Sequence, residues 1–164
     1  MSAATSGTRP LPLYTPSQRA RRDATVWTTV QGILAPVQFL VFAASLILVL
    51  RFLATGEGYT AATVSILLKT AFLYTIMITG AIWEKVVFGQ YLFAPAFFWE
   101  DVVSFAVIAM HSLYLYGLLT NSIPPRKLML ITLAAYATYF LNATQFLLKL
   151  RRARLDSGPK GQPA

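Results

Sequence analysis

Residues 27–53 read WTTVQGILAPVQFLVFAASLILVLRFL, and this run decides the class of fold. Its only charged residue, Arg51, stands close to its end. A helix needs about 20 apolar residues to cross the hydrocarbon core of a bilayer, which is roughly 30 Å thick. The run is also far longer than a signal-peptide core, and no small-residue cleavage site follows it. We therefore expect it to stay in the protein as a transmembrane helix.

Three further apolar runs follow, and each is set off by residues that break helices. They occupy about residues 61–87, 99–119 and 127–150. Gly56 and Gly58 precede the first of these runs, Pro95 precedes the second, and Pro124 and Pro125 precede the third. The whole chain is 56% apolar and only 12% charged, about half the charged fraction of a soluble domain. These features predict an all-α fold, an integral membrane four-helix bundle.

The two ends of the chain differ in composition from the predicted bundle. Residues 1–18 are rich in Ser, Thr and Pro and cannot bury much apolar surface, so we expect a flexible N-terminal tail. A folded domain is expected over residues 19–155, and a second flexible tail over residues 156–164. The chain contains no cysteine, which excludes disulfides and thiolate chemistry within it.

Lys and Arg gather on one side of the predicted bundle. That side holds Arg9, Arg19, Arg21, Arg22, Lys85, Lys149, Arg151, Arg152, Arg154 and Lys160, whereas the other holds Arg51, Arg126 and Lys127. The positive-inside rule then places the N- and C-termini in the cytoplasm. Because these residues border apolar runs, the net charge of +8 fits contact with the headgroups of the lipid bilayer, and we expect no nucleic-acid partner.

Polar residues follow one face of the first and of the last run. They are Gln31, Gln38 and Ser45 in the first, and Asn142, Gln145 and Lys149 in the last. Spacings of seven residues, and of three and seven, return a helix to the same face. Amide hydrogen bonds between helices explain these seams as well as contact with a ligand does.

Three of the six acidic residues gather at the predicted cytoplasmic ends of the second and third runs: Glu84, Glu100 and Asp101. Interfacial anchoring and complementation of the helix dipole are the ordinary roles for such residues. Their convergence instead predicts a catalytic site, because acids near membrane depth tend to be functional. Asp101 should point about 100° away from Glu100, so these two should not form a close pair.

Two other titratable residues fall inside the predicted spans. His111 lies on nearly the same helical face as Glu100, about 16 Å further along the axis. A neutral imidazole bonded to a neighbouring helix is its simplest role, and a catalytic role is the alternative. Lys69 falls in the outer half of its run, where its stem could reach the headgroups, and we assign it no chemistry.

Six aromatic residues crowd the segment between the second and third runs: Phe88, Tyr91, Phe93, Phe97, Phe98 and Trp99. An interfacial aromatic belt is one explanation. The other is a flat apolar platform for a large planar ligand that partitions into membranes.

Several strings carry a family resemblance: VQGILAPVQFLVF (30–42), ATGEGY (54–59), GAIWEKVVFG (80–89), FAPAFFWED (93–101) and NATQFLLKLR (142–151). Over about residues 14–155 the chain resembles the bacteriochlorophyllide 3-vinyl hydratase family of phototrophic bacteria. The resemblance implies addition of water to the 3-vinyl group of a chlorophyllide, giving the 3-(1-hydroxyethyl) product of bacteriochlorophyll biosynthesis. It also implies a multi-pass protein of the bacterial inner (photosynthetic) membrane. The substrate carries its own magnesium, so no further cofactor is implied.

Hydration of a vinyl group needs an acid and a positioned water molecule. A carboxyl group half buried among aromatic rings favours its neutral form, so Glu84 or Glu100 is our expected acid. The other carboxylate, or Asp101, would orient and deprotonate the water, and His111 would be a base or a ligand of the substrate magnesium. The expected substrate-binding residues are Gln31, Gln38, Lys85, Phe97, Phe98, Trp99, Asn142 and Gln145.

A membrane protein that binds or hands over tetrapyrroles without catalysis is the alternative function. It would need the aromatic platform but not the acids. In either case the expected partners are a chlorophyllide-type tetrapyrrole and the lipid bilayer, with water as co-substrate of the hydratase. A second copy of the chain and other pigment-biosynthesis enzymes are further expected partners.

Overall fold

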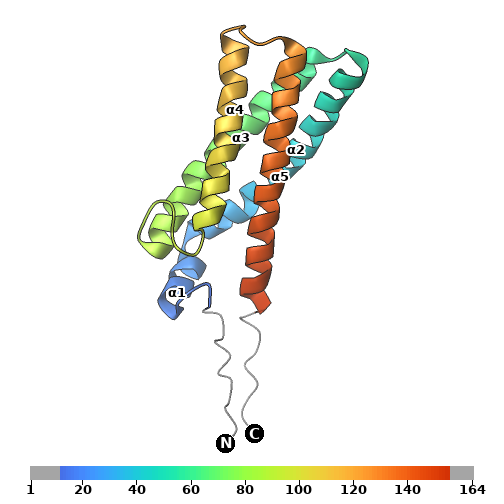
Figure 1. Ribbon diagram of the computed structural model, residues 1–164. Helices are drawn as coiled ribbons and strands as arrows, with labels where there is room; N and C mark the ends of the chain where they lie inside the picture. Colours follow the sequence, from blue (N-terminus) through green and yellow to red (C-terminus); the bar gives the residue numbers. More distant parts are fainter. Residues whose placement is uncertain (1–11, 156–164) are drawn as a thin grey trace, which may run out of the picture.

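The computed structural model describes residues 12–155, and this part of the chain is all-α, as the sequence predicts. Its helices are α1 (Pro16–Ala24), α2 (Val26–Thr55), α3 (Tyr59–Phe88), α4 (Phe98–Leu119) and α5 (Pro125–Leu155) (Figure 1). Helices α2 to α5 correspond to the four predicted runs. The short helix α1 was not predicted.

The four long helices form two hairpins, α2 with α3 and α4 with α5. Gly56 and Gly58 both adopt left-handed backbone angles, with φ of 76° and 80°, and make the tight turn between α2 and α3. Asn121 (φ 50°) makes the corresponding turn before α5. Both turns lie at one end of the molecule, whereas α1, the α3–α4 connection and the end of α5 lie at the other (Figure 1).

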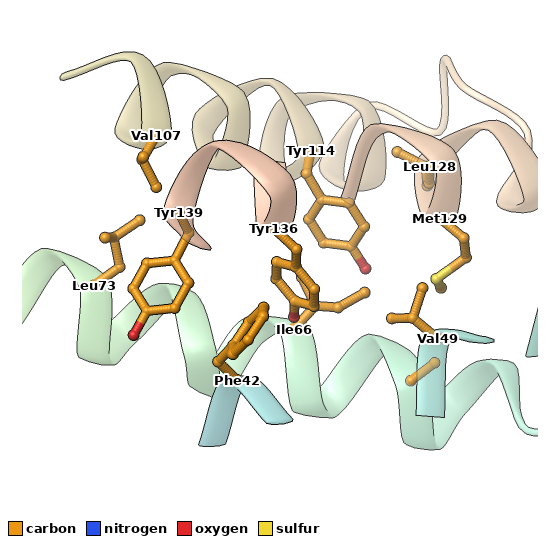
Figure 2. Packing of buried hydrophobic residues seen from close by; sticks show 11 residues of the cluster. Phe42, Val49, Ile66, Leu73, Val107, Tyr114, Leu128, Met129, Tyr136 and Tyr139 are labelled. Atoms are coloured by element: carbon orange, nitrogen blue, oxygen red, sulfur yellow. The ribbon is translucent and has the colours of Figure 1, made fainter. Parts of the chain in front are cut away.

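The hairpins pack through one cluster of buried apolar and aromatic side chains (Figure 2). Phe42 of α2 contacts two rings of α5, with its centroid 5.2 Å from that of Tyr136 and 4.9 Å from that of Tyr139. Ile66 of α3 and Tyr114 of α4 complete the centre of the cluster. The core therefore lies between the hairpins and joins all four long helices.

The outer faces of these helices are apolar as well. Leu40, Ile47 and Leu147 are among many large apolar side chains that are mostly exposed. In the described part of the chain, α2, α3 and α4 are long and apolar enough to cross a membrane. Helix α5 does not reach the same hydropathy, and its second half carries amides and basic residues.

The segment before α2 differs from the expected flexible tail over residues 12–18. Pro16 occupies the first turn of α1, where a missing N–H costs nothing, and Thr15 and Gln18 form a capping box. Tyr14 is buried against Phe88, and its burial raises the pKa of its phenol, an effect that nearby Arg22 partly offsets. Proline marks a helix start here rather than disorder. Residues 1–11 and 156–164 of the predicted tails lie outside the described residues.

Candidate active site

The connection between α3 and α4 builds the candidate site at one end of the bundle. Helix α3 ends at Gly89, whose left-handed backbone (φ 90°) reverses the chain, and α4 begins at Phe98. Ala94 lies between them and is fully buried. A buried irregular segment leaves backbone N–H groups without regular partners, so nearby side chains must accept from them.

Glu84 and Asp101 supply two of those acceptors. The Glu84 Oε2 accepts from the Ala94 N–H at 3.1 Å, and the Asp101 Oδ2 accepts from the Phe93 N–H at 2.7 Å. These acids are only 5% and 3% exposed, and they accept from two neighbouring residues of the same connection. Two buried carboxyl groups that lie close together disfavour a double negative charge, which favours a proton on one of them. The structure thus brings together a buried acid pair from α3 and α4.

Glu100 has a different partner, Lys149 of α5. The Lys149 Nζ lies 2.5 Å from the Glu100 Oε2 and also donates to the Ala96 carbonyl. It is 5.1 Å from the centre of the Phe97 ring. Glu100 therefore forms an ion pair with Lys149, whereas no ion pair in the described chain involves Glu84 or Asp101. Glu100 and Asp101 engage different groups, in keeping with their expected directions.

Two amides of α5 carry buried oxygen atoms, and one of them, Asn142, is linked through Ser104 to the backbone of Glu100. The Asn142 Nδ2 donates to the Ser104 Oγ at 2.7 Å, and Ser104 in turn donates to the Glu100 carbonyl at 2.8 Å. The Asn142 Oδ1 and the Gln145 Oε1 are buried and have no hydrogen-bond partner within residues 12–155. They lie on neighbouring turns of one helix face. Two unused acceptors can bind a ligand that donates two hydrogens.

The aromatic residues of the connection, expected to form either an interfacial belt or a platform, fall into two groups in the structure. Phe97 is buried and stacks on Phe146, whereas Phe98 and Trp99 are exposed, Trp99 by 68%. Successive residues at a helix start point in directions about 100° apart, which separates Phe97 from the other two.

Phe93, one of the six crowded aromatic residues seen in the sequence, and Phe105, which was not among them, join the exposed group. Phe93 stacks on Phe105 with ring centroids 5.4 Å apart, and it also contacts Phe98. Phe93 has φ 59°, a strained angle for a bulky residue, and the Asp101 carboxylate holds its N–H. The aromatic density around Phe93 was visible in the sequence, but its contact with Phe105 depends on how the connection folds.

Three further expected substrate-binding residues, Gln31, Gln38 and Lys85, make no ion pair or hydrogen bond with the acids among residues 12–155. The Gln31 Nε2 donates to Thr79 of α3 at 2.7 Å, and Gln38 is buried with no hydrogen-bond partner for its Oε1 within residues 12–155. Lys85 is exposed and donates to the Gly89 carbonyl at the end of α3. Gln31 thus joins α2 to α3, and Lys85 caps the end of α3.

His111 and Lys69 occupy the middle of the bundle, away from the acid site. Both are buried, and the expected extension of Lys69 toward the headgroups is wrong, because its Nζ lies 3.6 Å from the centre of the Tyr139 ring. His111 packs near Tyr136, with ring centroids 5.9 Å apart. In residues 12–155 no group of three or more His, Asp or Glu side chains is arranged to hold a metal ion.

Comparisons with known proteins agree with the resemblance noted in the sequence. A family model described as 2-vinyl bacteriochlorophyllide hydratase matches residues 14–152. A protein of that name from Rhodobacter capsulatus is 70% identical over 145 residues, which cover 88% of this chain and 84% of the relative. Another from Cereibacter sphaeroides is 74% identical over 144 residues, covering 88% of this chain and 89% of the relative. No solved structure matches the chain.

Proposed function

Because this chain belongs to the 2-vinyl bacteriochlorophyllide hydratase family, we propose that it adds water to the vinyl group of a chlorophyllide-type tetrapyrrole. The product carries a 1-hydroxyethyl group in place of the vinyl group. Positions 2 and 3 are the same site of the macrocycle under two numbering schemes. The family match over nearly the whole described chain is the observation that carries this proposal.

The membrane arrangement that supports this function has four spans, α2 to α5, with both termini in the cytoplasm. Arg19 and Arg21 of α1 and Arg152 and Arg154 of α5 lie at one end of the bundle, which fits the positive-inside rule. The apolar outer faces suit contact with lipid. A bacterial inner membrane would bring the acid site to the cytoplasmic side, close to water.

The reaction adds one proton and one water oxygen across the double bond. An acid protonates the terminal vinyl carbon, and the resulting cation at the inner carbon is delocalised into the macrocycle. The oxygen of a water molecule bonds to that inner carbon and its extra proton passes to a carboxylate. One water is consumed and the acid pair regains its proton, so no further cofactor is needed for the balance.

Glu84 is the acid that the geometry favours. It forms no ion pair within residues 12–155, and it is buried near Asp101 on the same connection. Glu100, by contrast, is engaged in an ion pair with Lys149. The sequence left open whether Glu84 or Glu100 is the acid. We assign Glu84 as the acid, Asp101 as the group that takes up the proton, and Glu100 as a structural residue of the site.

Asn142 and Gln145 are suited to orient the attacking water. Their unpartnered oxygens can accept both hydrogens of one water molecule. The lone pairs of that water then remain free to attack the cation. A water molecule bound in this way gives each of the two buried amide oxygens a hydrogen-bond partner.

The exposed aromatic group is suited to receive the macrocycle from the lipid phase. Phe93, Phe98, Trp99 and Phe105 present rings on the outside of the same segment whose backbone the acids hold. A planar tetrapyrrole that stacks on this group would have an edge beside Asp101. This group retains Phe93, Phe98 and Trp99 of the aromatic segment seen in the sequence and adds Phe105.

His111 falls outside the acid site in this proposal. About 16 Å of helix separates it from Glu100, so it does not serve as base for the same water. Its Nδ1 is bonded to the Val107 carbonyl, which leaves Nε2 as the nitrogen that could ligate the substrate magnesium. That ligation would require a second position of the macrocycle, deeper between the hairpins.

The test is conversion of chlorophyllide a by membranes that contain the folded protein. The product should be heavier by one water and absorb at shorter wavelength, because conjugation of the vinyl group is lost. Absence of conversion by folded wild type would reject the hydratase function. Full turnover by Glu84→Gln would reject only our choice of acid.

A tetrapyrrole-binding or assembly protein without catalysis is the second candidate, and the exposed aromatic group is the observation that favours it. Wild type would then bind chlorophyllide, leave the vinyl group unchanged, and bind equally well after Glu84→Gln. A pull-down with a second pigment-biosynthesis enzyme or with another copy of the chain would test the partners that such a role implies.

A further inference from the structure

Lys69 and His111 form a second polar centre in the middle of the bundle. Lys69 of α3 is 0% exposed and His111 of α4 is 1% exposed, so they come from different hairpins. Polar groups inside a membrane protein lose water on every side, and an unpaired one costs several kcal/mol. Both residues therefore need partners inside the protein.

His111 presents a hydrogen-bond acceptor to this centre. Its Nδ1 lies 2.8 Å from the Val107 carbonyl, which can only accept, so Nδ1 carries the hydrogen. In the neutral ring the other nitrogen, Nε2, then has a free lone pair. This Nε2 is buried and has no hydrogen-bond partner in the described chain.

Lys69 presents donors to the same centre. The face of the Tyr139 ring, 3.6 Å away, attracts its Nζ but accepts no conventional hydrogen bond. The Nζ has no hydrogen-bond acceptor among residues 12–155. Lys69 packs on Tyr139 and His111 packs near Tyr136, and these two tyrosines lie three residues apart on one face of α5. In this second polar centre Lys69 can therefore donate hydrogen bonds, and His111 can accept one.

We propose that Lys69 and His111 bind an internal water molecule between them. Water accepts from the ammonium group and donates to Nε2, whereas a carbonyl oxygen cannot donate and a cation would be repelled by Lys69. Two to four polar partners are usual for a buried water, and Lys69 and His111 supply the first two. The water links α3 to α4, next to the direct bond between Ser45 of α2 and Tyr136 of α5 at 2.6 Å. Both hairpins are tied together through this polar layer.

The site can be tested by X-ray radiolytic labelling of the full chain in lipid nanodiscs, which marks side chains next to bound water. Tyr139 is the reporter, because its ring contacts Lys69. Met129 is the matched control, since it is a reactive side chain in the same buried cluster but lies among apolar neighbours. We expect Tyr139 to be labelled at least fivefold faster than Met129 in wild type.

The variants Lys69→Met, His111→Phe and the double variant remove the donor, the acceptor or both. Labelling of Tyr139 should fall at least fivefold in the double variant, while Met129 stays unchanged. Equal labelling of Tyr139 and Met129 in wild type would overturn the proposal even if no variant folded. Unchanged Tyr139 labelling in a folded double variant would overturn it as well. No substrate is used, so the outcome is independent of the hydratase assay.

Discussion

The acid site and the Lys69–His111 centre contain residues of the same two helices, yet their surroundings differ. Glu84 and Asp101 lie where α3 and α4 end, and backbone N–H groups of the connection are available to them. Lys69 and His111 lie among complete helical turns, whose backbone groups are already paired. Helix ends therefore create hydrogen-bonded acid sites, whereas the middle of a bundle leaves polar side chains dependent on each other and on water.

The largest effect should come from Glu84→Gln, which keeps the size of the side chain but removes its acidic proton. We expect the hydration rate to fall about 100-fold or more, the usual range for loss of a general acid. The rate of chlorophyllide conversion measures this, and pigment binding should remain.

Glu57→Gln is the matched control, because Glu57 is exposed in the α2–α3 turn and makes only a long contact with Arg51 of 3.9 Å. It should convert substrate at the wild-type rate. A loss at Glu100→Gln that exceeded the loss at Glu84→Gln would reverse our assignment of the acid.

The next effect concerns stability. Lys149→Met should leave the buried Glu100 carboxylate without its cation and lower the free energy of unfolding by about 2 kcal/mol, less than for a fully buried pair because Lys149 is partly exposed. Thermal unfolding in detergent measures the change. Adding Glu100→Gln to this variant should recover part of the loss, and no recovery would mean that the ion pair does not stabilise this end.

A smaller effect is expected on substrate binding. Trp99→Ala should raise the KM for chlorophyllide about fivefold and leave kcat nearly unchanged, because loss of one aromatic stacking contact costs about 1 kcal/mol. Tyr116→Ala provides the control, since Tyr116 is similarly exposed but lies near the other end of α4. An equal rise in KM in both variants would mean that loss of any exposed aromatic ring disturbs contact with the lipid, and would contradict a binding platform at Trp99.

The smallest expected effect belongs to the middle of the bundle. Lys69→Met keeps most of the stem and removes the contact of the ammonium group with Tyr139, which is worth about 1 kcal/mol. Thermal unfolding should show a smaller loss than for Lys149→Met. A larger loss would mean that the charge of Lys69 contributes more to the stability of the protein than the charge of Lys149 does.

Part of the candidate site could be predicted from the sequence. Glu84, Glu100 and Asp101 were found because acids are rare in apolar runs and these three share one end of the predicted bundle. Their pairing could not be found, since it depends on which way α3, α4 and α5 turn toward one another. Asp101 meets Glu84 across two helices, and Glu100 meets Lys149 across two others.

The direction of the Lys69 side chain also could not be predicted from the sequence. A lysine in the outer half of a span is compatible with a stem that reaches the headgroups and with a stem that turns inward. Only the position of Tyr139, on a helix distant in sequence, decides between these directions. The helix α1 was missed for a related reason, because the prolines before it also suit disordered chain.

The sequence by itself determined the all-α class, the four long runs, the family and the acids at one end. Each of these follows from local composition, from helical period or from short strings of residues. Tertiary structure alone decided which acid is paired with lysine and which acids accept from the backbone of the α3–α4 connection, which aromatic rings face outward, and where Lys69 points. Those outcomes depend on contacts between helices far apart in the chain, and such contacts are set by packing rather than by any single stretch of sequence.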